Sequence, residues 1–308
     1  MPEAVLRPRR LDALLGVPHA LPYQGSKRAL AHTIVPLLPV DIDTLIEPFC
    51  GSAAVAVGAL YAGATPRVAL RDVNAPLVGL WQQIIDDPNG LATEYEQIWD
   101  GGIADPAGQY AAVRDRFNLE HRPSDLLYLL ARCVKAAVRY NAKGEFNQGA
   151  DNRRLGADPA RMRLRLNRTS AVLHGRTQVT AGDYAESLRL ATTLDVVYLD
   201  PPYQGTSGSG NGRYLSGLSR ADFSAELHRA TSAGTSFIVS YDGSTGGRTY
   251  GDDLPSELGL LHLHVAAGLS SQSTLSGEVE QTIESLYLSP ALVERLGGRS
   301  AILVPPAE

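Results

Sequence analysis

The stretch Asp-Val-Val-Tyr-Leu-Asp-Pro-Pro-Tyr at residues 195–203 decides the fold. Its apolar centre predicts a buried strand, and the two prolines end that strand because proline donates no backbone hydrogen bond. Ligands bind at the carboxyl ends of strands in open α/β sheets, so we expect Asp200 and Tyr203 at the edge of a crevice. A carboxylate and an aromatic ring would then face one ligand, although a proline-rich turn without a binding role would also fit this stretch alone.

The chain is long enough for one large domain with an insertion. It has 308 residues, of which 44% are hydrophobic, as in ordinary globular proteins. It has no run of about 18 apolar residues and no apolar segment behind its first basic residues, so we expect neither a membrane span nor a signal peptide and predict a cytoplasmic protein. Cys50 and Cys133 show no metal-type spacing, so we expect two reduced thiols and no metal site.

A strand, a glycine turn and a helix follow one another near the N-terminus. Residues 44–47 predict the strand, residues 48–52 the turn, and residues 53–61 the helix. Gly51 would let the backbone approach a nucleotide-type cofactor closely, with the N–H groups of the helix available for its polar groups. This arrangement predicts a nucleotide site.

A second strand, residues 67–72, ends in an acid about twenty residues after the glycine turn. In βαβ units such an acid binds ribose hydroxyls, so we predict this role for Asp72. Alternatively, Asp72 caps the next helix with help from Asn74.

A turn at residues 22–27, Pro-Tyr-Gln-Gly-Ser-Lys, precedes a short helical pattern that stops at Pro39. A phosphate loop is disfavoured here, because the full glycine-lysine pattern is absent and no strand comes before it.

The middle of the chain, residues 86–170, predicts helices in place of the βα rhythm. We expect one helix over residues 126–139, with an apolar face and a basic face that Arg132, Lys135 and Arg139 share. Residues 132–168 carry ten Lys and Arg against three Asp and Glu, a charge of +7 inside a chain of net charge −5. We therefore predict a contact with nucleic acid here, although a charged helix face is often only solvated.

The βα rhythm returns in the last third of the chain. Residues 178–180 and 236–241 predict strands, a helix is expected around residues 223–230, and residues 260–265 and 282–288 predict an antiparallel pair. The Gly/Ser-rich residues 204–211 predict a mobile loop near the site.

Six motifs in this order resemble the Dam-like (D12 class) adenine-specific DNA N6-methyltransferases of the alpha group. They are residues 22–27, Glu-Pro-Phe-Cys-Gly at 47–51, Asp-Val-Asn at 72–74, Arg-Tyr-Asn-Ala-Lys-Gly-Glu-Phe-Asn at 139–147, Gly-Asp-Tyr at 182–184, and Asp-Pro-Pro-Tyr at 200–203. The chain departs from the family at Ala53, where a second glycine is usual, and at residues 148–151, where the family has a Val-Pro-x-Gly-like turn.

The resemblance implies an α/β fold: a Rossmann-like, S-adenosylmethionine-dependent methyltransferase sheet with an inserted, mainly helical DNA-recognition domain. Residues 20–85 and 171–290 would form the catalytic domain, and residues 86–170 the target-recognition insert. The implied reaction transfers a methyl group from S-adenosylmethionine to N6 of a flipped-out adenine in double-stranded DNA. A cognate restriction endonuclease would act as a separate partner.

The resemblance also implies the residues of the site. The Asp200 carboxylate and the Pro201 carbonyl would accept hydrogen bonds from the target amine, and Tyr203 would stack on the base. The implied catalytic residues are Asp200, Pro201, Pro202 and Tyr203; the cofactor-binding residues are Tyr23, Lys27, Glu47, Pro48, Phe49, Gly51, Asp72, Asn74, Asp183, Tyr184 and Asp200; the DNA-binding residues are Arg139, Tyr140, Asn141, Lys143, Asn147, Arg153 and Arg154.

Three alternatives stay open at this point. An N4-cytosine methyltransferase uses a similar tetrapeptide, more often with serine in place of Asp200. An RNA or protein methyltransferase would keep the cofactor motifs and lose the 139–147 segment. A non-catalytic DNA-binding protein could use the same scaffold.

Overall fold

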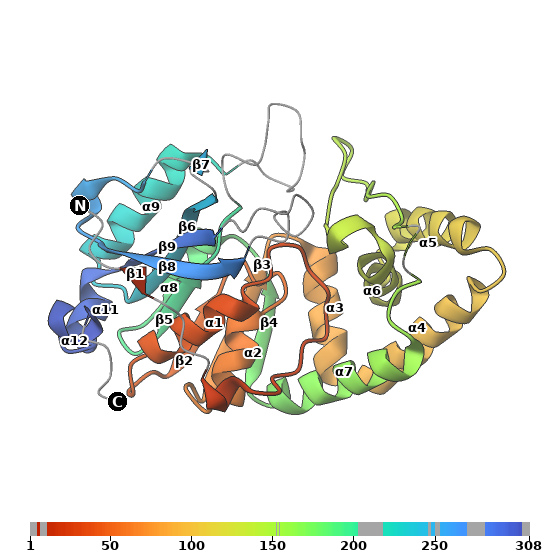
Figure 1. The fold of residues 1–308 in the computed structure, drawn as a ribbon, viewed down its shortest axis with the longest axis horizontal. Helices are drawn as coiled ribbons and strands as arrows, with labels where there is room; N and C mark the ends of the chain where they lie inside the picture. The colour runs from red at the N-terminus through yellow and green to blue at the C-terminus, as the bar shows by residue number, and fades with distance from the viewer. Residues whose placement is uncertain are drawn as a thin grey trace.

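A twisted sheet forms the centre of the computed structural model, which describes residues 5–6, 11–151, 153, 155–202, 218–245, 248–249, 253–269 and 281–303. In this part of the chain nine strands form one sheet, in the order β1-β8-β9-β6-β5-β2-β3-β4, with β7 paired to β6 (Figure 1). The strands are β1 Val5–Leu6, β2 Thr44–Glu47, β3 Arg67–Asp72, β4 Thr177–Ala181, β5 Val196–Leu199, β6 Phe237–Thr245, β7 Arg248–Thr249, β8 Leu261–Leu269 and β9 Gln281–Leu288.

Five neighbouring strands, β4, β3, β2, β5 and β6, run parallel. β9 lies antiparallel between β6 and β8, which confirms the predicted antiparallel pair. The chain leaves β2 toward β3 on one side and returns to β5 on the other, so strand order reverses between β2 and β5. Such a switch point opens a crevice at the carboxyl ends of the strands. The sheet confirms the predicted Rossmann-like fold.

Strand β5 shows why an uninterrupted apolar run is needed at the centre of the sheet. All four of its side chains are fully buried. Val196 and Tyr198 belong to the larger core, whereas Val197 and Leu199 belong to the smaller one. A central parallel strand is covered on both faces, so alternate side chains enter different cores.

Helices cover both faces of the sheet. Leu30 of α1 (Arg28–Ile34), Val55 of α2 (Ala54–Tyr61) and Leu77 of α3 (Ala75–Asp86) lie in the larger core. Leu188 of α8 (Tyr184–Leu190) and Phe223 of α9 (Arg220–Ser232) lie in the smaller core. The predicted helices at 53–61 and around 223–230 are confirmed. Short elements complete this part: the 3-10 helices η1 Asp12–Leu14, η2 Val35–Leu37 and η5 Ser256–Leu258, and the helices α11 Pro290–Arg295 and α12 Arg299–Leu303.

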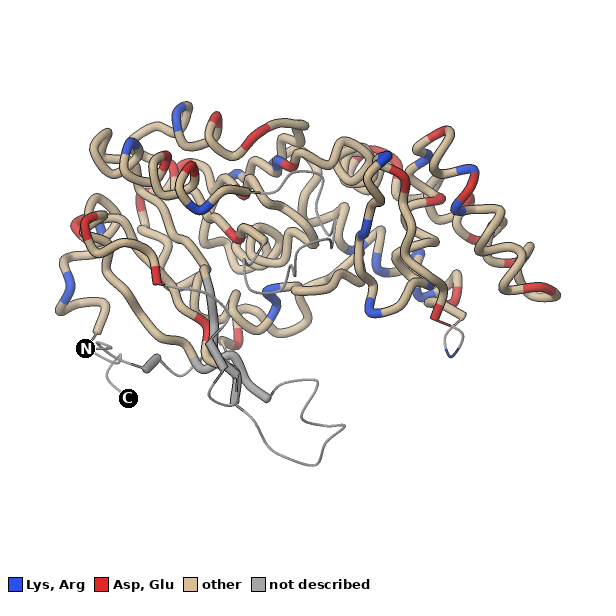
Figure 2. The backbone as a smooth tube through the Cα atoms, turned by 90° about the horizontal axis from the view of Figure 1, so that it is seen from above, with Lys and Arg blue, Asp and Glu red and all other residues tan. Residues whose placement is uncertain are grey.

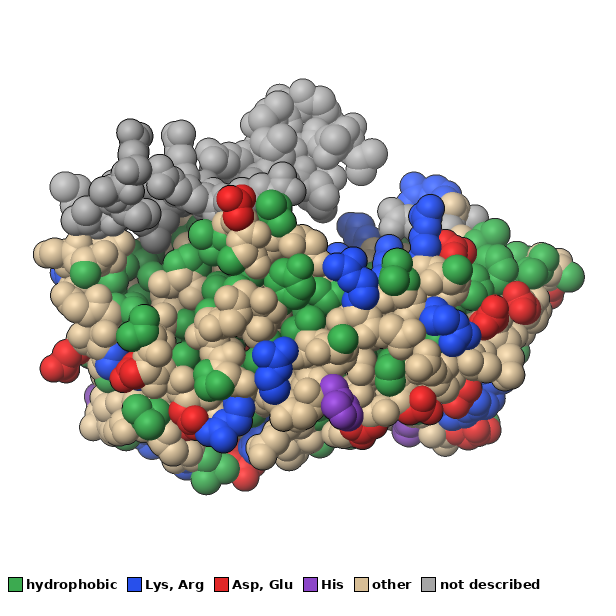
Figure 3. Space-filling model, turned by 90° about the horizontal axis from the view of Figure 1, so that it is seen from below, with side chains coloured by type: hydrophobic (Ala, Val, Ile, Leu, Met, Phe, Trp, Pro, Cys, Tyr) green, Lys and Arg blue, Asp and Glu red, His purple; other side chains and the backbone are tan. Residues whose placement is uncertain are grey.

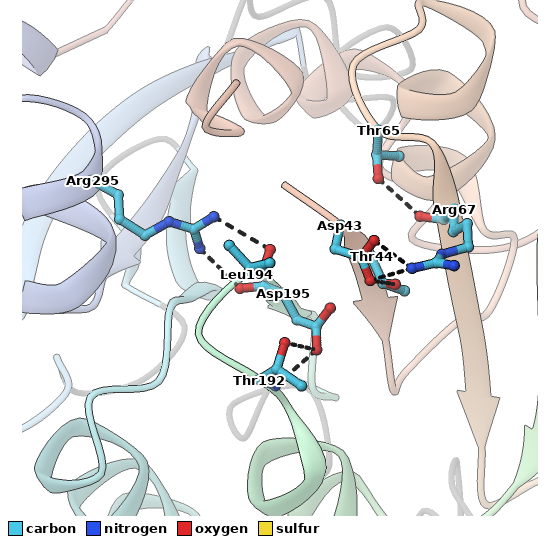
Figure 4. A network of polar contacts seen from close by, with 8 residues as sticks. All are labelled: Asp43, Thr44, Thr65, Arg67, Thr192, Leu194, Asp195 and Arg295. Atoms are coloured by element: carbon cyan, nitrogen blue, oxygen red, sulfur yellow. Dashed lines mark hydrogen bonds and ion pairs between the residues drawn. The ribbon is translucent and has the colours of Figure 1, made fainter. Parts of the chain in front are cut away.

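A network of polar side chains lies at the amino ends of the central strands, opposite the crevice (Figure 4). Asp195 accepts hydrogen bonds from the backbone N–H and the hydroxyl of Thr192, both at 2.8 Å. Arg295 of α11 donates to the Asp195 carbonyl at 3.1 Å. Arg67 pairs with Asp43 beside it. These contacts fix where β2, β3 and β5 begin.

Residues 86–170 form a group of helices at the right of Figure 1. They are α4 Pro88–Gly101, α5 Pro106–Glu120, α6 Pro123–Arg132, the 3-10 helix η3 Val134–Ala136, and α7 Pro159–Leu173. Proline stands first in α4, α5, α6 and α7, and α4, α5 and α7 follow a capping aspartate: Asp87, Asp105 and Asp158 accept from backbone N–H groups at 2.8–3.0 Å. The buried side chains of these helices join the same core as α3.

The helix predicted over residues 126–139 is wrong in its second half. α6 ends at Arg132, Cys133 is extended, and Lys135 is left-handed, with φ 59°. The backbone of Arg132 and Val134 instead bonds with Asp151 and Gly149, at 2.8 and 3.0 Å. This pairing replaces the helical hydrogen bonds.

The predicted basic face does not form as a consequence. Arg132 is only 4% exposed; its guanidinium lies 5.8 Å from the centre of the Tyr128 ring. Arg132, Lys135 and Arg139 therefore share no helix face. In the described ranges, no helix is long and apolar enough to cross a membrane.

Candidate active site

A pocket of about 250 Å³ opens at the switch point between β2 and β5. The carboxyl ends of β2, β3 and β5, the turn at 22–27 and the segment at 138–140 form its walls. It brings together most of the predicted catalytic and cofactor residues: Tyr23, Lys27, Glu47, Phe49, Gly51, Asp72, Asn74, Asp183, Tyr184, Asp200, Pro201 and Pro202. Pro48 precedes Phe49 and is not part of the wall. Tyr203 and residues 204–211 lie outside the described residues.

The glycine turn forms one wall and is tight. Gly51 has φ 44°, and a Cβ there would lie 3.2 Å from the Tyr23 ring. The indole of Trp81 holds the turn by donating to the Gly51 carbonyl at 2.9 Å. Ala53, where the family usually has glycine, is left-handed, with φ 48° and ψ 34°. The alanine keeps the glycine conformation at a cost of about 1–2 kcal/mol.

Glu47 stabilises the start of the helix that follows this turn. Its Oε2 accepts from the backbone N–H of Ala56 at 3.0 Å, which caps the first turn of α2. Ala53 has no side chain that could do so. Burial raises the pKa of Glu47 well above its usual range.

Asp72 stands at the end of β3 and faces the turn. Its Oδ1 accepts from the Asn74 N–H at 2.9 Å, and its Oδ2 lies 3.5 Å from the Gly51 nitrogen. Burial raises the pKa of Asp72 to about 6, against hydrogen bonds from Asn74 and Gly51 that lower it. Asn74 begins α3 but makes no capping hydrogen bond with its side chain; its Oδ1 accepts from the Tyr140 hydroxyl at 3.2 Å. The Asn74 side chain therefore does not help to cap α3, as the alternative reading of Asp72 and Asn74 had expected.

Stacked aromatic rings also line the pocket. Phe49 and Tyr184 lie with their centres 5.2 Å apart and their planes 25° from parallel. Asp183 caps α8 by accepting from the Ala185 N–H at 2.8 Å. An acid beside an aromatic surface suits a flat ring with an exocyclic amine.

Asp200 ends β5 inside a network of polar side chains. Its Oδ1 accepts from Ser240 at 2.9 Å, and Ser240 in turn shares a hydrogen bond of 2.9 Å with Tyr198. The Lys27 ammonium lies 3.5 Å from the same oxygen and 2.9 Å from Oε2 of Glu284. Burial raises the pKa of Asp200 to about 6; the Lys27 ammonium opposes this rise and Glu284 adds to it.

Sequence reasoning missed Ser240 and Glu284. Ser240 interrupts the apolar strand 236–241, and Glu284 lies within the strand 282–288. Each is a polar residue in a predicted strand of mostly apolar residues, which was the available signal. Their proximity to Asp200 depends on the sheet order.

The predicted DNA-binding segment 139–147 forms a hairpin, with a bridge between Tyr140 and Phe146. Asn141 holds its tip together: Oδ1 accepts from the N–H groups of Lys143 and Glu145 at 2.9 and 3.1 Å, and Nδ2 donates to Glu145 at 2.8 Å. Lys143 is exposed at this tip. The Asn141 side chain therefore shapes the loop that presents Lys143.

The other predicted DNA-binding residues lie at different depths. Tyr140 is buried, 5% exposed, and lines the pocket, so we assign it to the pocket and not to a DNA-binding surface. Asn147 is exposed and Arg139 half-buried. The Arg153 side chain is 86% exposed, with Nε 3.2 Å from Asp151. Arg154 lies outside the described residues.

The basic residues that give residues 132–168 their charge of +7 do not lie together on one surface. The hairpin rises at the upper edge of Figure 1, whereas α7 runs along the lower edge. On α7, Arg163 pairs with Glu96 at 3.0 Å and Arg168 donates to the Gly16 carbonyl at 2.9 Å. Acidic and basic residues alternate along these helices in Figure 2, and basic side chains are spread over the face seen in Figure 3.

The sheet order, together with a pocket that both Asp72 and Asp200 line, defines a Rossmann-like methyltransferase fold. The model of the D12 class N6 adenine-specific DNA methyltransferases matches residues 23–264, and the chain belongs to this family. Glu284 lies beyond the matched residues.

Named relatives agree with the family. The chain is 31% identical over 189 residues to a DNA N-6-adenine-methyltransferase of Escherichia phage P1, a match that covers 59% of this chain and 23% of the phage protein. It is 28% identical over 229 residues to the Retron Ec67 DNA adenine methylase of Escherichia coli, with 71% and 75% covered. It is 25% identical over 199 residues to the type II methyltransferase M.FokI of Planomicrobium okeanokoites, with 62% and 30% covered. The chain thus spans less than a third of the phage P1 and M.FokI proteins.

Proposed function

We propose that this protein transfers a methyl group from S-adenosylmethionine to N6 of adenine at defined sites in double-stranded DNA. One observation carries the proposal: Asp200, the residue assigned to the target base, and Asp72, the residue assigned to the cofactor, line the same pocket. A base and a methyl donor bound there would meet, and proximity of the two reactants is the main requirement of a direct transfer.

The residues of the pocket fit S-adenosylmethionine. Asp72 would accept hydrogen bonds from the ribose hydroxyls, and the bare backbone of Gly51 leaves room beside them. Asp183 would accept from the exocyclic amine of the adenine ring, with Tyr184 against its face. The cofactor supplies a methyl group on a positively charged sulfur, and the carboxylates of Asp72 and Asp200 suit that charge.

Asp200 would act on the target amine. The lone pair of adenine N6 is delocalised into the ring, so hydrogen bonds accepted by Asp200 and the Pro201 carbonyl would draw N6 toward tetrahedral geometry. The base must leave the duplex to reach Asp200, at a cost of a few kcal/mol. Tyr203 would offset part of that cost by stacking on the base. The N6 lone pair would attack the methyl carbon as the bond from that carbon to sulfur breaks, with S-adenosylhomocysteine as the leaving group, and the N6 proton would be released to water. No covalent enzyme intermediate is required.

Residues 86–170 are our candidate for target recognition, with residues 20–85 and 171–290 as the catalytic domain. Lys143 at the hairpin tip would reach the DNA, and Arg139, Asn141, Asn147, Arg153 and Arg154 are the further candidates. The similarity to the type II methyltransferase M.FokI supports a restriction-modification role, in which a cognate endonuclease would act separately. Because double-stranded DNA is the substrate, we place the activity in the cytoplasm.

The test is methyl transfer to unmodified double-stranded DNA, with the modified positions mapped and Asp200→Ala as the inactive control. We expect N6-methyladenine within one recurring sequence. Modified cytosine would favour the N4-cytosine alternative. Binding of DNA and cofactor without transfer by the unaltered protein would favour a non-catalytic scaffold.

A further inference from the structure

Glu284 reaches the active site from the far end of the chain. Its Oε2 lies 2.9 Å from the Lys27 ammonium, across a sequence separation of 257 residues. The Lys27 side chain is 8% exposed and that of Glu284 18% exposed. A contact between two shielded charges is screened little by solvent, so it can hold Lys27 in place.

Lys27 has two carboxylates within reach and lies nearer to Glu284 than to Asp200. Its distance to Asp200 Oδ1 is 3.5 Å, and Ser240 donates to that same oxygen at 2.9 Å. Both contacts fall on Oδ1, which leaves Oδ2 to accept from the target amine. A Lys27 released from Glu284 could close onto Asp200 and compete with the amine.

We propose that Glu284 is a positioning residue: it holds the Lys27 ammonium against β9, so that Lys27 and Ser240 fix Asp200 through Oδ1 and Oδ2 stays available for the adenine amine. This inference rests on the proposed function, because the amine is its substrate. Glu284 touches neither base nor cofactor in this role and acts through Lys27.

Among the residues that the structure describes, the charged and titratable groups around Asp200 come from four elements. They are Lys27 before α1, Glu47 at the end of β2, Tyr198 on β5 beside Asp200, and Glu284 on β9. Removal of the Glu284 charge takes one anion from this set and lets Lys27 approach Asp200. Both effects favour the ionised form of Asp200, so both lower its pKa.

The experiment is a double-mutant cycle between Lys27 and Glu284, with kcat as the readout. Glu284→Ala should lower kcat by about tenfold, as the coupling of contacting residues allows. Affinity for S-adenosylmethionine should stay within a few-fold. Glu284→Gln keeps an acceptor for Lys27 and should lose less. Lys27→Met with Glu284→Ala should be little slower than Lys27→Met alone, because the proposed role of Glu284 is to hold Lys27.

The pH profile separates this role from a structural one. The acidic limb of kcat should move to lower pH by about half to one unit in both Glu284 variants. Glu226→Gln on α9 is the matched control, since Glu226 is 15% exposed and paired with Arg229. It should leave kcat and the limb unchanged. Additive effects in the cycle, or an unmoved limb in Glu284→Gln, would overturn the inference.

A carbon-13 NMR titration of the Asp200 carboxyl in the ligand-free protein, assigned with Asp200→Asn, gives a readout without turnover. Its pKa should fall in Glu284→Gln. If the unaltered protein transfers no methyl group, the proposed function fails, while this titration still tests the Glu284–Lys27–Asp200 arrangement. An unchanged Asp200 pKa would overturn the arrangement itself.

Discussion

At the scale of single residues, the pocket places ionisable groups where burial opposes their charge. Asp72 and Asp200 both have a pKa raised to about 6, chiefly by burial. Groups held in this way cost stability and are typical of functional sites. The raised pKa of Asp200 therefore predicts how kcat changes with pH, and that of Asp72 predicts how thermal stability changes with pH.

Asp200→Ala should abolish methyl transfer and leave cofactor affinity within a few-fold, because Asp200 is assigned to the base. In the unaltered protein, kcat should fall as pH drops through about 6, since protonated Asp200 is a poorer acceptor. Steady-state rates between pH 5 and 8 and calorimetry with the cofactor measure both. Near-normal turnover by the variant would remove Asp200 from the mechanism.

Asp72→Asn should weaken cofactor binding by about 1–3 kcal/mol, because it removes a charged partner of the ribose hydroxyls. It should also raise the melting temperature, more at pH 8 than at pH 4.5. The raised pKa in the folded protein means that ionised Asp72 costs stability above about pH 6 and costs little near its unfolded value. Thermal melts at the two pH values check this. Unchanged cofactor affinity would make Asp72 only a turn-former.

Ala53→Gly should stabilise the protein by about 1 kcal/mol, because glycine adopts the left-handed conformation without strain. Ala59→Gly, in the interior of α2, is the control and should destabilise it by a similar amount or more. Chemical denaturation measures both. Equal losses from the two changes would show that Ala53 carries no strain.

At the scale of elements, the 139–147 hairpin is joined to the segment at residues 72–74 and to the turn at 22–27. Tyr140 at the base of the hairpin donates to Asn74 at 3.2 Å, and the Ala136 carbonyl accepts from the Gln24 N–H at 3.0 Å. The segment between α6 and the hairpin thus packs against both the 22–27 turn and the start of α3. The DNA contacts proposed for the hairpin and the cofactor contacts proposed for the pocket would therefore share one support.

Tyr140→Phe should weaken cofactor binding by about 0.5–1.5 kcal/mol, the value of one lost hydrogen bond. Lys143→Ala at the exposed tip should leave cofactor affinity unchanged and alter discrimination between the target site and its single-base variants. Calorimetry and competition binding separate the two. Full cofactor affinity in Tyr140→Phe, with altered site preference, would instead assign Tyr140 to the DNA.

At the scale of the whole molecule, charge is distributed by the fold and not by sequence position. Residues 132–168 sum to +7, yet Arg132 is buried inside and Arg163 pairs with an acid on α4. The Lys and Arg side chains available to bind DNA are those that are exposed on the side of the molecule where the pocket opens.

Replacing Arg153 and Arg154 by alanine should weaken binding to all DNA sequences alike. It should also flatten the salt dependence, whose log–log slope is near −0.9 per phosphate neutralised. Arg161→Ala on α7 is the matched control: Arg161 is 78% exposed and pairs with Asp158, much as Arg153 pairs with Asp151. Salt titrations of DNA affinity test this. A silent arginine pair would place the phosphate contacts elsewhere.

The central strands, the glycine turn and the acids at the strand ends could be predicted from the sequence. These features depend on local rules: an apolar run such as 196–199 must be buried, and Pro201 and Pro202 cannot continue a ladder. The family motifs then brought Asp72, Asp183 and Asp200 into one predicted pocket. The end of each strand is a local property, and parallel strands align their ends at one edge.

Contacts between residues far apart in the sequence could not be predicted and are seen only in the folded chain. Glu284 reaches Lys27, and Ser240 reaches Asp200, because β9 and β6 take particular places in the sheet. The end of α6 at Arg132 likewise follows from pairing with Asp151, which outweighs helical spacing. Local pattern fixes what each segment can form, whereas contacts between distant segments depend on packing of the complete chain.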